Sequence, residues 1–219
     1  MKVKAPYEEV CRYLGYKKGA RPEPEAGALI RACTARVEQA AEPRTVSTVL
    51  PLTFREGNEM ELGPIRIKSA ALHRNLLGCE EVILFAATLG LEVDRLIARA
   101  GAGRVAEGAI YQAAGAALIE EVCDRANDAL RTESEAEGWY LRPRFSPGYG
   151  DFPLSCQREL LTLLRAPETI GLTAGESMLL LPTKSVTAVM GRSRLALPCH
   201  RTGCEACGKT DCAYRRDEA

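Results

Sequence analysis

The feature of this sequence that most constrains its fold is the segment 104–130, whose apolar residues repeat with the period of an α-helix. They form one stripe along the segment, at Ile110, Ala114, Leu118, Val122, Ala126 and Leu130. Gly108, Gly115 and many alanines lie beside this stripe, and such small residues allow another element to approach closely. The sequence therefore predicts a long, central and tightly packed helix.

Shorter patterns on both sides of this helix indicate a sheet. The run 82–87 is continuously apolar and is the strongest candidate for a central strand, and 45–54 is an alternating, β-branched strand pattern. The segments 60–62 and 65–67 are expected to be two short strands or one kinked strand. Further strands are expected at 178–181 and 185–190, and further helices at 7–14, 25–41, 69–77, 92–99 and 154–164. The segment 134–147 is polar and turn-rich, and periodicity is lost from Arg192 onward. These elements predict an α+β fold, with helices over a mostly antiparallel sheet.

The composition is that of an ordinary globular protein and argues against several classes of partner. The 219 residues are 46% hydrophobic and 26% charged, and 29 basic residues balance 29 acidic ones. Nucleic-acid and anionic-membrane binders usually carry a basic excess, so neither partner is expected. The start of the chain has no apolar signal region and no stretch is long enough to span a bilayer, so we expect a soluble, cytoplasmic protein. No dinucleotide fingerprint, phosphate-binding loop or nucleophilic triad is evident, and His73 is expected to be a surface or half-buried residue of a helix.

The most informative loop runs from Arg144 to Pro153 and reads Arg-Phe-Ser-Pro-Gly-Tyr-Gly-Asp-Phe-Pro. Pro147 stiffens the turn, while Gly148 can adopt a positive φ and leave backbone groups uncovered. Tyr149 offers a flat ring and a hydroxyl, and the planar guanidinium of Arg144 suits a carboxylate or phosphate. These residues fit a small zwitterionic nucleoside, but a turn whose Tyr and Arg side chains pack locally explains them equally well.

The same loop, together with the helix and strand patterns C-terminal to it, resembles the activation domain of cobalamin-dependent methionine synthase. That domain carries Arg-x-x-x-Gly-Tyr, then a helix, then a strand with Pro-x-x-Ser-Val. The corresponding residues here are Arg144, Gly148, Tyr149, Pro182, Ser185 and Val186. The resemblance is specific over 104–191 and predicts an activation-like domain over 1–191, followed by a Cys-rich tail over 192–219.

The resemblance implies a binding site for S-adenosylmethionine. Arg144 would bind the methionyl carboxylate, and the backbone and ring at Gly148 and Tyr149 would hold the adenosine. Glu120, on the preceding long helix, would face the ligand, and a solvated helix face is the alternative for this residue. Phe145, Ser146 and Ser185 complete the implied set of ligand-binding residues. No catalytic residue is predicted, because methyl transfer from a sulfonium needs no general acid or base.

The implied role is that of a reactivation subunit. The sequence has no Asp-x-His-x-x-Gly signature for ligating cobalamin and is too short for the folate and homocysteine barrels. The resemblance therefore implies a subunit that docks on a partner carrying the corrinoid and supports the reductive methylation of cob(II)alamin. That partner would be methionine synthase or another corrinoid methyltransferase. A non-catalytic module that caps a corrinoid protein, with the Arg144 loop as its docking surface, is the alternative, so whether the chain is an enzyme stays open.

The nine cysteines divide into two groups. Five are scattered through apolar segments and are expected to fill the core as free thiols: Cys11, Cys33, Cys79, Cys123 and Cys156. The other four form a C-x4-C-x2-C-x4-C pattern near the C-terminus: Cys199, Cys204, Cys207 and Cys212. Four thiols in one short run can hold an iron–sulfur cluster or zinc, and an unmetallated tail is the third alternative. If they hold a cluster, the protein would bring its own electron to the corrinoid.

Overall fold

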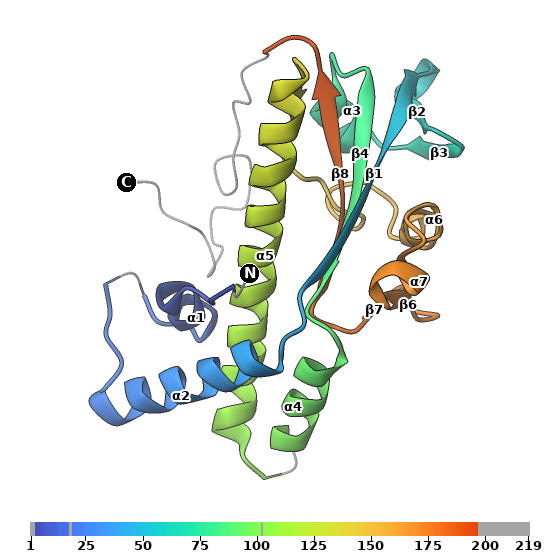
Figure 1. Cartoon of the computed structure of the whole chain (residues 1–219). Helices are drawn as coiled ribbons and strands as arrows, with labels where there is room; N and C mark the ends of the chain where they lie inside the picture. The colour runs from blue at the N-terminus through green and yellow to red at the C-terminus, as the bar shows by residue number, and fades with distance from the viewer. Residues whose placement is uncertain (1–2, 18, 102, 197–219) are drawn as a thin grey trace. The chain divides into compact units, whose positions relative to one another are not determined.

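The computed structural model (Figure 1) describes residues 3–17, 19–101 and 103–196, and the chain divides into two compact units. In the described part of the chain, the first unit comprises residues 3–17, 19–43, 89–101 and 103–124, and the second comprises residues 44–88 and 125–196. Within the described residues, no helix combines the length and the apolar character needed to cross a membrane.

The first unit is helical in its described part. It contains α1 (Tyr7–Tyr13), α2 (Pro24–Ala40), α4 (Leu91–Gly101) and most of α5 (Val105–Ala136). Proline occupies the first position of α2, where its missing N–H costs nothing. Ile30, Cys33 and Val37 recur at helical spacing and form the buried face of α2, which packs against α1 and α4. These helices confirm the predictions for 7–14, 25–41 and 92–99.

The 32-residue helix α5 confirms the predicted long helix and extends it. Its small residues Ala113, Ala114 and Ala117 are buried, as expected for a tightly packed helix. The predicted end at Leu130 is wrong, because α5 continues to Ala136. The added turn contains Glu133 and Glu135, which favour helix but lack the apolar period on which the prediction depended.

The second unit is built on a six-stranded antiparallel sheet with the strand order β3-β2-β1-β4-β8-β5. The strands are β1 (Arg44–Phe54), β2 (Glu59–Leu62), β3 (Ile65–Lys68), β4 (Glu81–Thr88), β5 (Tyr140–Leu141) and β8 (Ser185–Ser193). β4 lies between β1 and β8, and both of its faces are buried. The continuous apolar run at 82–87 is therefore the central strand that the sequence predicts.

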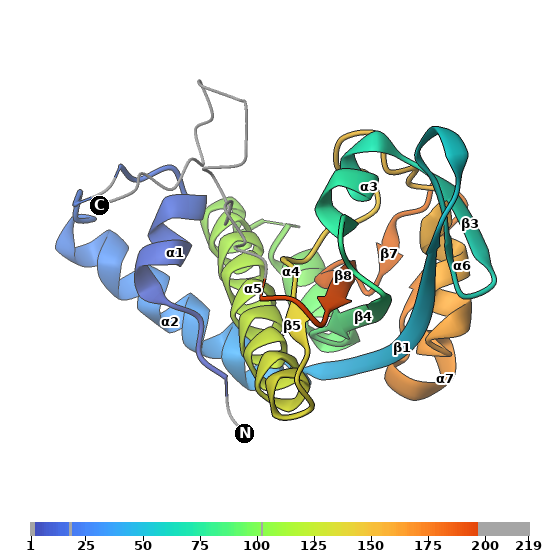
Figure 2. The ribbon, with the colours of Figure 1, turned by 90° about the horizontal axis from the view of Figure 1, so that it is seen from above.

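Three helices cover one face of this sheet: α3 (Ala70–Leu76), α6 (Cys156–Leu163) and α7 (Ala166–Ile170). Figure 2 shows α6 and α7 beside β1. The core beneath them includes Leu84, Val189, Phe152 and Leu160. A short hairpin of β6 (Thr173–Ala174) and β7 (Leu180–Leu181) comes after α7 in the chain.

Several predicted boundaries in this unit are wrong. The strand expected at 178–181 is only the short β7, because Met178 has a φ of 62° and does not continue a strand. The segment 134–147 begins as helix and contains β5, while α7 and β6 were not predicted. β8 continues past the predicted 190 to Ser193.

Arg192 explains the extension of β8. It is only 6% exposed, and its side chain forms ion pairs with Glu81 and Glu137, each at 2.8 Å. The ring of Trp139 lies 4.8 Å from the guanidinium carbon of Arg192 and 3.9 Å from that of Arg194. In the sequence, the charge of Arg192 interrupts the apolar pattern and so marks the end of the predicted strand. In the structure, the residue is buried and the strand continues through it.

Candidate functional site

The Arg144 loop begins as an irregular strand along β8. The amide of Arg142 donates to the carbonyl of Gly191 at 2.8 Å, and Phe145 and Val189 exchange two hydrogen bonds of 2.9 Å. Pro143, which has no N–H to donate, lies between these two points. The backbone of Arg144 is therefore fixed on both sides by the sheet, and the residue is half-buried.

The loop then closes into a tight turn over residues 146–152. The amide of Tyr149 donates to the carbonyl of Ser146 at 3.2 Å, and that of Gly148 donates to the carbonyl of Phe152 at 2.9 Å. Gly148 has a φ of 90°, as expected for a glycine that makes the turn possible. Both amides are used within the turn, so neither the Gly148 N–H nor the Tyr149 N–H is left to donate to a ligand.

The side chains of the turn divide into an inner and an outer group. Pro147 is buried, and the ring of Phe145 stacks against Phe152 with centroids 6.3 Å apart. Tyr149 touches Phe145 edge-on at 6.5 Å but is 67% exposed. Packing within the turn thus accounts for the aromatic side chains of Phe145 and Phe152. Most of the Tyr149 ring stays in contact with solvent.

Asp151 anchors the turn to the start of α3, and no local pattern in the sequence indicates this role. Its carboxylate accepts hydrogen bonds from Ser69 Oγ at 2.6 Å and from the amides of Ala70 and Ala71 at 2.7 and 2.9 Å. These bonds, led by that of the Ser69 hydroxyl, lower the pKa of Asp151 from 3.8 to about 2. Gly150 passes so close to α3 that a Cβ there would lie 2.8 Å from the Cβ of Ala71.

Ser185 stands at the start of β8, as the Pro-x-x-Ser-Val pattern places it. Its hydroxyl lies 2.7 Å from the carbonyl of Pro182, to which it donates, and shares a hydrogen bond of 2.8 Å with the hydroxyl of Thr88. The Leu181–Pro182 peptide bond is cis. The hydrogen bonds of Ser185 join the first residue of β8 to the last residue of β4.

Glu120 lies on the part of α5 that belongs to the first unit, whereas the other predicted ligand-binding residues lie in the second. It is half-buried and lies within electrostatic range of Tyr13. Burial is the main cause of a raised pKa at Tyr13, and the negative charge of Glu120 is the next. The guanidinium of Arg12 stacks on the same Tyr13 ring at 4.4 Å.

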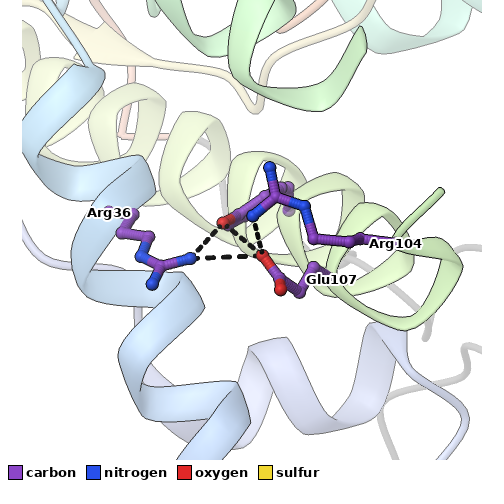
Figure 3. A network of polar contacts seen from close by, with 4 residues as sticks. Arg36, Arg104 and Glu107 are labelled. Atoms are coloured by element: carbon purple, nitrogen blue, oxygen red, sulfur yellow. Dashed lines mark hydrogen bonds and ion pairs between the residues drawn. The ribbon is translucent and has the colours of Figure 1, made fainter. Parts of the chain in front are cut away.

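The first unit also contains a polar network between α2 and α5, which Figure 3 shows from close by. Glu107 accepts from Arg36 and Arg104, each at 3.2 Å, and from the hydroxyl of Tyr111 at 3.1 Å. Arg36 also donates to the Tyr111 oxygen at 2.9 Å. Tyr111 is buried, and this burial raises the pKa of its phenol. The network joins two helices, and none of its members is a predicted site residue.

A mostly apolar hollow of about 380 Å³ lies in the first unit between α2, α5 and the segment that follows α1. None of the predicted ligand-binding residues lines it. The lining residues are Leu14, Gly15, Tyr16, Ala26, Leu29, Ile30, Ala106, Ala109 and Ile110.

The structure describes the five scattered cysteines but not the four C-terminal ones. Cys11, Cys33, Cys79, Cys123 and Cys156 are free and buried, as predicted. Among the residues that the structure describes, no three His, Cys, Asp or Glu side chains are grouped so that they could hold a metal ion. Cys199, Cys204, Cys207 and Cys212 lie outside the described residues.

Comparison with known proteins identifies the fold. No family model matches the sequence, and no curated protein matches it. A solved structure of the MetH reactivation domain bound to AdoHcy matches with a TM-score of 0.60, over 86% of this chain and 77% of that one. The sequence identity of 19% limits this likeness to the fold. The predicted α+β class, with its antiparallel sheet and long helix, is thereby confirmed: this chain has the fold of the MetH reactivation domain.

Proposed function

We propose that the protein binds S-adenosylmethionine and supports the reactivation of a cobalamin-dependent methionine synthase or a related corrinoid protein. The observation that carries this proposal is the Arg144 loop, which is fixed along β8 and leaves Tyr149 67% exposed. The shared fold supports it, because the matching domain is bound to AdoHcy, the product that S-adenosylmethionine leaves after losing its methyl group.

The loop residues are suited to the two ends of this ligand. The planar guanidinium of Arg144 can donate two parallel hydrogen bonds to the methionyl carboxylate. The exposed ring of Tyr149 offers a surface on which adenine can stack. The proposed role of Glu120 is electrostatic, because a carboxylate attracts the positive sulfonium and ammonium groups.

The protein would contribute to the chemistry by holding the methyl group of the ligand in a fixed position and orientation. In the reactivation, a one-electron donor such as a reduced iron–sulfur cluster would reduce cobalt(II) of the partner to cobalt(I). The electron pair of cobalt(I) would then form the bond to the methyl carbon while the C–S bond of the sulfonium breaks and its electron pair stays on sulfur. A ligand held at both ends by Arg144 and Tyr149 has few orientations, which lowers the entropic cost of presenting the methyl group to the partner.

Calorimetric titration of the full chain with S-adenosylmethionine tests the proposal. Arg144→Ala removes a charge-assisted hydrogen bond worth ~1.5–3 kcal/mol, so the affinity should fall by about 10- to 150-fold. Arg131→Ala is the matched control, since Arg131 is an exposed arginine of the same unit that forms an ion pair with Asp128. Its affinity should equal that of the wild type.

An unchanged affinity in Arg144→Ala would remove the main residue of the proposed site. If that variant instead loses binding to a cobalamin-containing partner, the docking-module alternative replaces the ligand-binding proposal. Pull-down of the corrinoid partner also separates methionine synthase from other corrinoid methyltransferases.

The four C-terminal cysteines add a proposed redox function that depends on their spacing alone. A reduced iron–sulfur cluster held by these thiolates would give one electron to the partner's cobalt and become oxidised by one electron. Anaerobically purified protein should then be brown, with bound iron and sulfide that are lost in Cys207→Ser. A colourless protein with one equivalent of zinc, or with no metal, would contradict the cluster.

A further inference from the structure

Among the described residues, β1 lacks a neighbouring strand on one side along much of its length. β1 pairs with β4 over residues 44–51, but β2 covers its other edge only over residues 52–54. The part of the chain that the structure describes therefore places no strand beside residues 45–49 on this side.

The hydrogen-bond pattern shows which backbone groups point outward. The amide of Leu52 donates to Glu80 at the end of the β4 ladder, whereas the carbonyl of Pro51 accepts from Gly63 at the β2 hairpin. The backbone N–H and C=O groups of successive residues point to opposite sides of a strand. The backbone groups of even-numbered β1 residues therefore point toward β4, and those of odd-numbered residues point outward. The outward groups along the open edge are the N–H and C=O of Thr45, Ser47 and Val49.

This edge lacks the features with which proteins usually prevent edge pairing. All three residues are exposed, Val49 by 46%. No charged residue occurs between Thr45 and Phe54, and Pro51 lies beyond the open segment. Charged residues, prolines or bulges normally protect such an edge, so this one is competent to accept another strand.

We propose that two copies of this chain associate by antiparallel pairing of their β1 edges, with Ser47 on the two-fold axis. In this register Ser47 faces Ser47 of the second copy, and Thr45 faces Val49 in both directions. All outward groups then meet outward groups, which gives three residue pairs that each exchange two hydrogen bonds. The inference does not depend on the proposed ligand.

The side chains favour a second copy as the occupant. The exposed face of the junction would carry only Ser, Thr and Val, which are small or β-branched and uncharged. The two copies of Arg44 would lie six residues apart, roughly 20 Å at the rise of an extended strand, so they would not repel each other strongly. A two-fold arrangement occupies the open segment of β1 in both copies, so pairing at this segment stops at the dimer.

Sedimentation equilibrium of the full chain under reducing conditions tests this association. The wild type should show a concentration-dependent equilibrium between monomer and dimer. Ser47→Lys places two like charges directly opposite each other and should raise the dissociation constant by about tenfold or more. Thr53→Lys is the matched control, because Thr53 is exposed on the same strand but pairs with Glu61 of β2, and it should leave the constant within about twofold.

A cross-link gives a second readout that does not depend on a disruptive charge. Opposed residues of a hydrogen-bonded pair have Cα atoms about 5.5 Å apart, within the range of about 4.4–6.8 Å that a disulfide spans. Ser47→Cys should therefore oxidise to a dimer whose linked peptides are both residue 47, whereas Thr53→Cys should not. A wild type that stays monomeric at every concentration, equal effects of the two lysines, or no 47–47 link would overturn the proposal.

Discussion

Each unit contains a carboxylate that gathers several hydrogen-bond donors, and the kind of donor differs between the two. Asp151 binds a hydroxyl and two backbone amides at the start of α3. Glu107 binds two guanidinium groups and a phenol, and one of the guanidinium groups belongs to Arg36, whose side chain is 53% exposed. Backbone donors are held in place by the fold, whereas a long exposed side chain loses rotamer freedom when it binds. Asp151 therefore fixes the position of a loop, while Glu107 only joins two helices near the surface.

The largest loss of stability is expected from a substitution at Gly150, where the turn that Asp151 anchors approaches α3. Gly150→Ala combines a positive φ of 56° with a Cβ contact of 2.8 Å to Ala71. The expected loss in the free energy of unfolding is about 3 kcal/mol, from backbone strain and overpacking together. Urea unfolding measures this loss.

Gly57→Ala is the control for the contact, because Gly57 has a φ of 66° and an alanine Cβ at this position would have no neighbouring atom within 4 Å. Only the backbone strain of about 1 kcal/mol applies there. Equal losses in the two variants would mean that the close approach to α3 contributes nothing.

A smaller effect is expected when Asp151 is replaced, and it should depend on pH. The folded-state pKa of about 2 lies below the ordinary value of 3.8. A lowered carboxyl pKa contributes stability that is present above about pH 4 and is lost as the pH falls through about 2. Asp151→Asn should therefore be less stable than the wild type near neutral pH, and the difference should shrink in acid.

Thermal unfolding between about pH 2 and pH 7 measures this difference. Asp128→Asn is the control, since Asp128 is an exposed residue that forms an ion pair with Arg131. A gap between wild type and Asp151→Asn that stays constant over this range would show that the hydrogen bonds do not depend on the charge of Asp151.

The smallest effect is expected at the Glu107 network. Arg36→Ala removes one exposed guanidinium, while Arg104 and Tyr111 still donate to Glu107. The shift of its unfolding temperature should be smaller than that of Asp151→Asn. It should also shrink in ~1 M salt, where the screening length is about 3 Å, whereas the neutral donors of Asp151 are insensitive to salt. If the unfolding temperatures of the two variants depended equally on salt, charged and neutral donors would not differ in this way.

The sequence predicts the elements whose signals are local. The run 82–87 reads as a central strand because both of its faces are apolar, and Gly148 reads as a turn residue because its neighbours are Pro147 and Tyr149. The contact between Asp151 and Ser69 joins residues 82 positions apart, and no local pattern indicates it. For the same reason the internal use of the Gly148 and Tyr149 amides could not be foreseen.

The candidate site is predicted less completely than the fold. The pattern of Arg144, Tyr149 and Ser185 comes from a resemblance, and the structure adds where each of these residues lies. Arg192 illustrates the general difficulty, because a charged residue ends the periodic pattern although its side chain is buried against Trp139 and two carboxylates. Burial that depends on distant ionic partners leaves no trace in apolar periodicity.

Trp139, which stacks against Arg192 and Arg194, is the sole tryptophan of the chain. All three residues belong to the second unit, so intrinsic indole fluorescence is an optical reporter for that unit alone. Circular dichroism at helix wavelengths would instead be weighted toward the helical first unit. If the two signals were to change at different temperatures, the units would melt independently, and if they coincide, the chain would unfold as one cooperative body.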